Sequence, residues 1–219
     1  MRIELEDGTP AERVEPSTGQ ATQGVVLCPD IMGLRPLFDE MAAKLADENG
    51  WVVVAPEPFA GNESMTLAER LTSVGNFDDL KVLNTIQQAA DATGFENVVI
   101  LGFCMGGMWA MKAAMTGRFR RAVSFYGMIR MPEAWRSPTQ SDAIDFVTAP
   151  GACPVLQLVG SDDTSVPMSD ISDLQAADVA VVIYEGAEHG FVHDPTRPTH
   201  RPEDAKDAWA RALAFLDGP

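Results

Sequence analysis

The sequence predicts an α/β fold: a mostly parallel central sheet with helices on both of its faces. Short runs of β-branched and aliphatic residues alternate along the chain with longer segments of helical periodicity. Such runs are typical of strands buried on both faces, and parallel neighbours need a crossover that is usually a helix. The length of 219 residues suits one such core. We therefore expect residues 1–219 to form a single domain.

Composition restricts the classes of partner and the compartment. Hydrophobic residues make up 46% of the chain and charged residues 22%, which is ordinary for a globular protein. The net charge of −16 would repel nucleic acid and anionic membrane surfaces, so we expect neither as a partner. The acidic residues 1–7 do not resemble a signal peptide, and no apolar run is long enough to span a membrane. Cys28, Cys104 and Cys153 lack the spacing of disulfides or metal sites, which predicts a reducing, cytoplasmic setting.

The N-terminal half is predicted to begin with a hairpin around the Asp7-Gly8 turn and then to alternate strands with helices. Gly50 and Gly94 end two of these helices, and Pro56 closes a strand. The predicted strands are residues 2–5, 11–14, 24–28, 51–55 and 98–101. The predicted helices are residues 38–48, 66–71, 78–93 and 108–115.

The C-terminal half continues this alternation with one long interruption. Residues 127–150 join two predicted strands through a stretch that holds several prolines, and its length indicates an excursion over the strand ends. The remaining predicted strands are residues 122–126, 155–159 and 179–184. The remaining predicted helices are residues 168–176 and 202–216, the second of them amphipathic.

The segment Gly102-Phe103-Cys104-Met105-Gly106-Gly107 matches a nucleophile elbow with cysteine in place of the commoner serine. A β-branched run enters it and strong helix formers leave it. Small residues flank the nucleophile because the turn from strand to helix is sharp and strained. A thiol at the start of a helix also lies at the positive end of the helix dipole, which favours the thiolate. The alternative is a chance pattern around a buried structural cysteine.

A cysteine nucleophile needs a base and a carboxylate that orients the base. His189 lies in a glycine-containing loop after a predicted strand, whereas His200 lies in a polar, Pro-rich stretch expected at the surface. The chain order nucleophile, acid, base is that of α/β-hydrolases, which favours Asp163 as the acid. Asp162 is the alternative, or a cap of the helix that follows.

Metal chemistry is not expected. His189 and His193 are close in sequence, but Gly190 and Pro195 disrupt a helical face, and no cysteine or glutamate completes a ligand set. We therefore predict no metal and no cofactor.

Four segments together resemble the dienelactone hydrolase (carboxymethylenebutenolidase-like) family of α/β-hydrolases. The elbow is similar to that family's Gly-aromatic-Cys-x-Gly-Gly pattern, and residues 160–167 (GSDDTSVP) resemble its Gly-x-x-Asp-x-x-Val-Pro segment. Residues 187–191 (AEHGF) resemble its histidine loop, and residues 125–127 (FYG) are also family-like. Order and spacing match over nearly the whole chain, and the cysteine elbow is the most specific element.

The resemblance implies an α/β-hydrolase fold and acyl transfer to Cys104, with His189 as base and then acid. It implies that Asp163 orients His189. An oxyanion would accept hydrogen bonds from the backbone N–H groups of Met105 and Ile31.

Other positions depart from the family pattern. The family holds its resting thiol with a glutamate after the first core strand, where this chain has the shorter Asp30. Asp30 is therefore the expected thiol-modulating carboxylate, with a turn or capping role as the alternative. The two arginines that bind the dienelactone carboxylate are absent, and His193 stands at one of these positions. Arg35, Tyr126 and His193 are the expected substrate contacts.

The sequence thus predicts a hydrolase of small carboxylic esters or lactones, which needs only a small-molecule substrate. Two alternatives remain: a thioesterase that uses the same three residues, and a non-catalytic binding protein that retains the fold. Fold alone does not decide between them, because function depends on the residues of the site.

Overall fold

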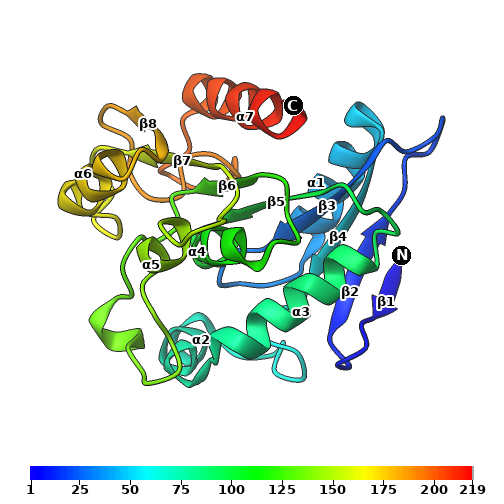
Figure 1. Cartoon of the computed structure of the whole chain (residues 1–219), viewed down its shortest axis with the longest axis horizontal. Coiled ribbons are helices and arrows are strands. Elements are labelled where there is room, and N and C mark those ends of the chain that lie inside the picture. Colours follow the sequence, from blue (N-terminus) through cyan, green and yellow to red (C-terminus); the bar gives the residue numbers. More distant parts are fainter. Residues whose placement is uncertain (219) are drawn as a thin grey trace.

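The computed structural model describes residues 1–218, and these form an eight-stranded sheet with helices on both faces (Figure 1). The strand order is β1-β2-β4-β3-β5-β6-β7-β8. The strands are β1 (Arg2–Glu4), β2 (Pro10–Val14), β3 (Gln23–Cys28), β4 (Trp51–Pro56), β5 (Val98–Phe103), β6 (Ala122–Phe125), β7 (Val155–Gly160) and β8 (Ala180–Tyr184). Strands β3 to β8 are joined by parallel pairs. The β1–β2 hairpin is antiparallel, and β2 also pairs antiparallel with β4. The mostly parallel α/β architecture predicted from the sequence is confirmed.

The helices divide between two layers that bury alternate residues of the strands. The helices are α1 (Pro36–Asn49), α2 (Leu67–Ser73), α3 (Asp79–Asp91), α4 (Met105–Ala113), α5 (Ala143–Val147), α6 (Met168–Ala176) and α7 (Pro202–Asp217). One apolar cluster joins α1 and α7 to Val25, Val99 and Leu101. The other joins α3, α4, α5 and α6 to Val26 and Ile100. Figure 1 accordingly shows α7 and α3 on opposite sides of the sheet. Strands covered on both faces explain why the sequence has continuous apolar runs.

The chain changes direction across the sheet between β3 and β5. From β3 it passes through α1 to β4 on one side, and then through α3 to β5 on the other side of β3. The loops after β3 and β5 therefore diverge at the carboxyl end of the sheet, which is where open α/β sheets form their binding crevices. Asp30 and Ile31 lie in the first of these loops, and Cys104 lies in the second.

Two helical features differ from the sequence-based expectations. Helix α4 begins at Met105, three residues before the predicted start, because Gly106 and Gly107 continue the helix despite their low helix propensity. The connection over residues 127–150 is not wholly irregular, because it contains the short 3₁₀ helix Glu133–Trp135 and helix α5. Short helices in a Pro-containing stretch give little periodic signal, so the sequence did not reveal them.

Helix α3 anchors that connection through a buried ion pair. Lys112 Nζ lies 2.7 Å from Asp79 Oδ1, with both side chains almost fully buried. The second oxygen of Asp79 accepts a hydrogen bond from the backbone N–H of Ser141. The carboxylate at the start of α3 thus ties helix α4 and the connection together. Among the described residues, no helix is long and apolar enough to cross a membrane.

Candidate active site

Cys104 sits on a strained turn between β5 and α4. Its backbone has φ 56° and ψ −118°, a conformation that costs a non-glycine residue about 1–3 kcal/mol. The turn is crowded: a Cβ on Gly102 would lie 2.2 Å from the carbonyl oxygen of Gly106. A Cβ on Gly106 would lie 2.2 Å from the carbonyl oxygen of Cys28. Glycine is therefore required on both sides of Cys104, as the elbow pattern predicts.

The Cys104 side chain is half-buried and stands at the first turn of α4. Its backbone N–H donates to the carbonyl oxygen of Phe125 on the neighbouring strand β6, at 3.0 Å. The position at a helix N-terminus stabilises negative charge on the sulfur.

His189 and Asp163 meet in loops that follow β8 and β7. The distance between His189 Nδ1 and Asp163 Oδ2 is 2.8 Å, and Asp163 Oδ1 accepts from the backbone N–H of Ser165, also at 2.8 Å. The two loops approach closely, because a Cβ on Gly160 would lie 2.0 Å from the carbonyl oxygen of Ala187. The structure therefore places Asp163 against His189, whereas Asp162 is exposed and bonds with Ser161.

The pKa of His189 is raised to about 10. Burial by itself lowers this pKa, but a hydrogen bond with Asp163 and a second with Cys104 raise it by more. Electrostatic interactions with Cys104 and Asp163 add to the effect. At neutral pH the ring is therefore a cation between Asp163 and Cys104. A charged imidazole beside a thiolate is the arrangement that activates cysteine nucleophiles.

A second histidine–aspartate pair lies four residues further along the same loop. His193 Nε2 lies 2.8 Å from Asp30 Oδ2, and the Asp30 carboxylate also binds Arg35 through Nη1 at 2.7 Å and Nη2 at 2.8 Å. The hydroxyl of Tyr126 bonds with His193 Nδ1. Asp30 further accepts from the backbone N–H of Met32. These contacts define the Asp30 network: Asp30, Arg35, His193 and Tyr126.

The charges in the Asp30 network differ from those of the His189–Asp163 pair. Burial raises the pKa of Asp30, but hydrogen bonds from His193 and Arg35 outweigh it and hold that pKa well below its ordinary range. Burial lowers the pKa of His193, and the bond to Asp30 does not fully oppose it. His193 is therefore neutral at pH 7, with Nε2 donating to Asp30 and Nδ1 accepting from Tyr126. Burial, together with the negative charges of Cys104 and Asp30, keeps the pKa of Tyr126 well above its ordinary value.

Tyr126 connects the two pairs. Its ring meets the ring of His189 edge-on, with centroids 5.1 Å apart, and its hydroxyl bonds with His193. Its backbone has φ 42°, which is uncommon for an aromatic residue. The oxygens of Asp30 have their partners within its own network and at Met32.

The loop after β3 is held by a buried carboxylate on the neighbouring loop. Glu57 accepts from the backbone N–H of Leu34 at 2.7 Å, and Arg70 Nη1 lies 3.7 Å from Glu57 and donates to the carbonyl oxygen of Ile31. Within residues 1–218, the N–H groups of Ile31 and Met105 have no hydrogen-bond acceptor. The two predicted oxyanion donors thus lie on the first residue of α4 and on the loop after β3, which approach each other closely at Gly106 and Pro29.

The sequence matches the dienelactone hydrolase family over residues 11–218. The chain belongs to that family. It is 28% identical over 209 residues to a probable 2-oxo-3-(5-oxofuran-2-ylidene)propanoate lactonase of a Bradyrhizobium species, covering 88% of this chain and 82% of that one. It is 29% identical over 231 residues to a putative carboxymethylenebutenolidase of Methylorubrum extorquens, covering 96% and 77%. A crystal structure of a putative dienelactone hydrolase from Klebsiella pneumoniae superposes with a TM-score of 0.87 at 24% identity, covering 100% of this chain and 98% of that one.

Family membership makes the protein an ester or lactone hydrolase and confirms the predicted enzyme class and the α/β-hydrolase fold. Among residues 1–218, no three His, Cys, Asp or Glu side chains gather closely enough to hold a metal ion.

This family member carries one cation at the site that sequence reasoning missed. The guanidinium of Arg197 lies beside the histidine loop: a Cβ added to Gly190 would be 2.3 Å from its Nη1. Its positive charge lowers the pKa of both His193 and Tyr126. Arg197 is exposed, and in the described chain no carboxylate forms an ion pair with it. Its sequence neighbours are loop residues, so no periodic pattern indicated that the chain folds back to the site.

Proposed function

We propose that this protein cleaves a small carboxylic ester or lactone through an acyl-cysteine intermediate. Cys104 is the nucleophile, His189 moves the proton, and Asp163 orients the ring of His189. The contact of these three side chains at the carboxyl end of the sheet carries the proposal. Backbone strain at Cys104 supports it, because such strain persists where the side chain reacts.

Acylation begins from the ion pair of thiolate and imidazolium. The Cys104 sulfur attacks the carbonyl carbon, and the carbonyl oxygen becomes an oxyanion that accepts from the N–H groups of Met105 and Ile31. When this intermediate collapses, the bond to the leaving oxygen breaks and His189 gives that oxygen its proton. In a lactone the leaving oxygen stays attached to the acyl group, so the ring opens.

Deacylation uses the neutral imidazole that acylation leaves behind. His189 takes a proton from water, and the resulting hydroxide attacks the thioester carbonyl. Collapse of the second oxyanion expels the thiolate of Cys104 and releases the acid. The ion pair with protonated His189 is then restored, so each cycle consumes one water.

We assign the residues of the Asp30 network to substrate contact and to positioning, not to proton transfer or nucleophilic attack. Arg35 is the member with a partly exposed side chain, at 26%, so we assign it the direct contact with substrate. His193 and Tyr126 are buried, and we assign them the positioning of Asp30 and of the His189 ring. We assign Asp30 the modulation of the thiol through charge, because Asp30 and Cys104 both act electrostatically on Tyr126.

Arg197 indicates the substrate class within that reaction. Arg35 is paired with Asp30, His193 is neutral, and protonated His189 lies between Asp163 and Cys104. Arg197, which has no carboxylate partner within residues 1–218, is therefore the cation we assign to an anionic acyl group. The relatives named as a lactonase of an oxofuran propanoate and as carboxymethylenebutenolidases fit a lactone that carries a carboxylate.

The carboxylate subsite is tested with the variant Arg197→Gln. KM for a mono-p-nitrophenyl ester of a short dicarboxylic acid should rise about tenfold, the loss expected for one charge-assisted contact. KM for the neutral p-nitrophenyl acetate should stay the same. An equal change for both esters would contradict a carboxylate subsite and leave the role of Cys104 untouched.

The nucleophile is tested with Cys104→Ala. Hydrolysis of p-nitrophenyl acetate should fall about 10³-fold or more, and the acyl adduct seen by intact mass in wild type should vanish. Cys153→Ala is the matched control, because burial raises the pKa of that thiol to about 11. Full turnover by Cys104→Ala would overturn the proposal.

Matched oxygen esters and thioesters distinguish the alternatives. The acyl-cysteine is itself a thioester that this site must hydrolyse, so a preference for thioesters over oxygen esters of the same acid would assign a thioesterase. Labelling of Cys104 by an electrophile without turnover of any ester would indicate a binding protein.

A further inference from the structure

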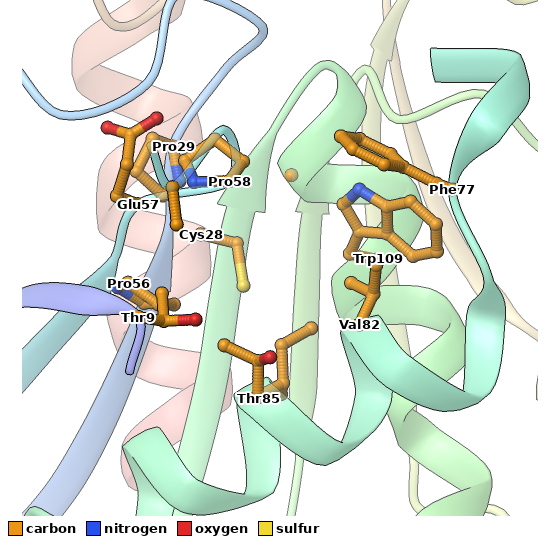
Figure 2. Close-up of a pocket in the computed structure, with 13 residues that line it drawn as sticks. Thr9, Cys28, Pro29, Pro56, Glu57, Pro58, Phe77, Val82, Thr85 and Trp109 are labelled. Carbon is orange, nitrogen blue, oxygen red and sulfur yellow. The ribbon is translucent and has the colours of Figure 1, made fainter. Parts of the chain in front are cut away.

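A glutamate and an arginine beside the loop after β3 are both almost fully buried, and the function proposed above gives neither a role. Glu57 follows β4, and Arg70 lies on α2. Burial of two charged side chains is costly unless both are paired and hydrogen-bonded. Figure 2 shows the Glu57 carboxylate turned away from the small pocket that Pro29 and Pro58 help to line. The partners of this carboxylate are backbone groups and Arg70.

The carboxylate of Glu57 fixes the far end of the loop. One oxygen accepts from the backbone N–H of Leu34 at 2.7 Å, and the other accepts from the backbone N–H of Phe59 at 2.8 Å. Gly33 has φ 70°, and a Cβ added to it would lie 2.5 and 2.7 Å from the two carboxylate oxygens. The loop therefore turns at a glycine that packs directly on Glu57.

Arg70 holds the peptide group that follows Ile31. Its Nη1 donates to the carbonyl oxygen of Ile31 at 3.4 Å and lies 3.7 Å from Glu57 Oε1. The same guanidinium donates to the backbone carbonyl oxygens of Glu63 and Met65, at 2.6 and 3.1 Å. These bonds anchor the guanidinium, so its contact with Ile31 restricts the loop.

Both peptide groups that flank the Cα of Ile31 thus have fixed orientations. In the peptide after Ile31, the oxygen accepts from Arg70, and the N–H of Met32 donates to the side chain carboxylate before it at 2.9 Å. In the peptide before Ile31, the oxygen of Asp30 accepts from the N–H of Gly33, also at 2.9 Å. The Ile31 N–H is the group of these two peptides that has no partner within residues 1–218. Because a peptide group is planar, fixing its oxygen also fixes the direction of its N–H.

We propose that Glu57 and Arg70 are positioning residues for the hydrolytic reaction, which hold the Ile31 N–H ready for the oxyanion. A donor that is already oriented needs no reorganisation when negative charge develops on the carbonyl oxygen. Loss of either side chain frees the loop to turn this N–H away, so the transition state loses stabilisation and ground-state binding of the ester does not. The inference rests on the proposed function, because it needs acyl transfer to Cys104.

Two reactions of Cys104 separate this role from general support of the fold. Hydrolysis of p-nitrophenyl acetate passes through an oxyanion in both of its steps, whereas alkylation by iodoacetamide displaces iodide at a saturated carbon and forms none. Both reactions use the same thiolate.

The variants Arg70→Met and Glu57→Gln should lower kcat for p-nitrophenyl acetate roughly tenfold to 100-fold. KM for this ester and the second-order rate constant of alkylation should change less than twofold. Rates are compared per folded molecule, with the folded fraction measured by circular dichroism. Glu57→Gln preserves the size of the side chain and one acceptor oxygen, so it carries the test if Arg70→Met does not fold.

Arg118→Met is the matched control. Arg118 likewise donates to two backbone carbonyl oxygens, those of Phe95 and Glu96, but these precede β5 at the opposite end of the sheet. Its loss should lower the free energy of unfolding and leave kcat unchanged.

Three results would overturn the positioning role of Glu57 and Arg70: equal falls in hydrolysis and alkylation, a change confined to KM, or an unchanged kcat. An equal fall of kcat in Arg118→Met would also overturn it. A failure of the proposed nucleophile is recognised separately, by full turnover in Cys104→Ala.

Discussion

Two histidine–aspartate pairs in this protein share a distance and differ in charge. His189–Asp163 and His193–Asp30 both have a nitrogen–oxygen distance of 2.8 Å, and their histidines are four residues apart. Yet the pKa of His189 is raised and the pKa of His193 is lowered. The hydrogen bond to a carboxylate therefore does not by itself decide the charge of the ring.

The neighbours of each pair explain the difference. Loss of water lowers the pKa of both rings, but hydrogen bonds and electrostatic interactions with two partners, Asp163 and Cys104, raise the pKa of His189 by more. His193 has Asp30 alone, and Asp30 is shared with Arg35, while Arg35 and Arg197 add positive charge. The side chain of His189 also keeps 20% exposure, whereas that of His193 has none. These differences support the roles that we propose, proton transfer for the first pair and structural support for the second.

The largest contrast is expected in activity. His189→Ala should lower kcat for p-nitrophenyl acetate by about 10²–10⁴-fold, because it removes the proton donor of acylation and the base of deacylation. His193→Gln keeps a donor for Asp30 and an acceptor for Tyr126, so its kcat should change less than tenfold. Equal losses in the two variants, at equal folded fraction by circular dichroism, would break the contrast.

The next contrast is expected in stability. His193→Leu leaves Asp30 short of a donor and the hydroxyl of Tyr126 short of an acceptor, both in buried positions. The free energy of unfolding in urea should fall by about 3 kcal/mol, and His193→Gln should recover most of it. When both are measured near pH 10, where the charge of His189 no longer contributes, His189→Ala should cost less, because its ring is partly exposed. A larger loss for His189→Ala would show that the catalytic pair is the structural one.

The smallest effect is a difference in pH dependence of unfolding. The pKa of His189 rises from 6.5 to about 10 on folding, so its contribution to stability is complete below pH 6.5 and is lost as the pH rises to about 10. The pKa of His193 falls below 6.5, so the unfolded state binds more protons there and stability rises with pH up to 6.5. Each slope is at most about 1.4 kcal/mol per pH unit.

Urea titrations between pH 5 and pH 10 measure both slopes. His189→Gln should abolish the fall in the free energy of unfolding between pH 6.5 and pH 10. His193→Gln should abolish the rise in that free energy as the pH increases to 6.5. Persistence of either slope in its variant would assign the titration to another group.

Most elements were predictable because their signals are local. Buried strands show continuous apolar runs, and α1 and α7 show helical spacing that ends near glycine. Helix α4 was misplaced at its start because tertiary crowding, not propensity, puts Gly106 and Gly107 in a helix. Helix α5 has five residues and gave no periodic signal.

The sequence alone determined which residue is held on a strained turn, which histidine and aspartates follow strands, and which chemical class such a set serves. It did so because Gly-x-Cys-x-Gly and the order of strand and loop are properties of neighbouring residues. Only the tertiary structure decided that Asp30 meets Arg35 and His193, and that the guanidinium of Arg197 lies beside Gly190 of the histidine loop. These contacts join residues far apart in the chain, and burial with neighbouring charge, which sets each pKa, exists only once the loops have packed.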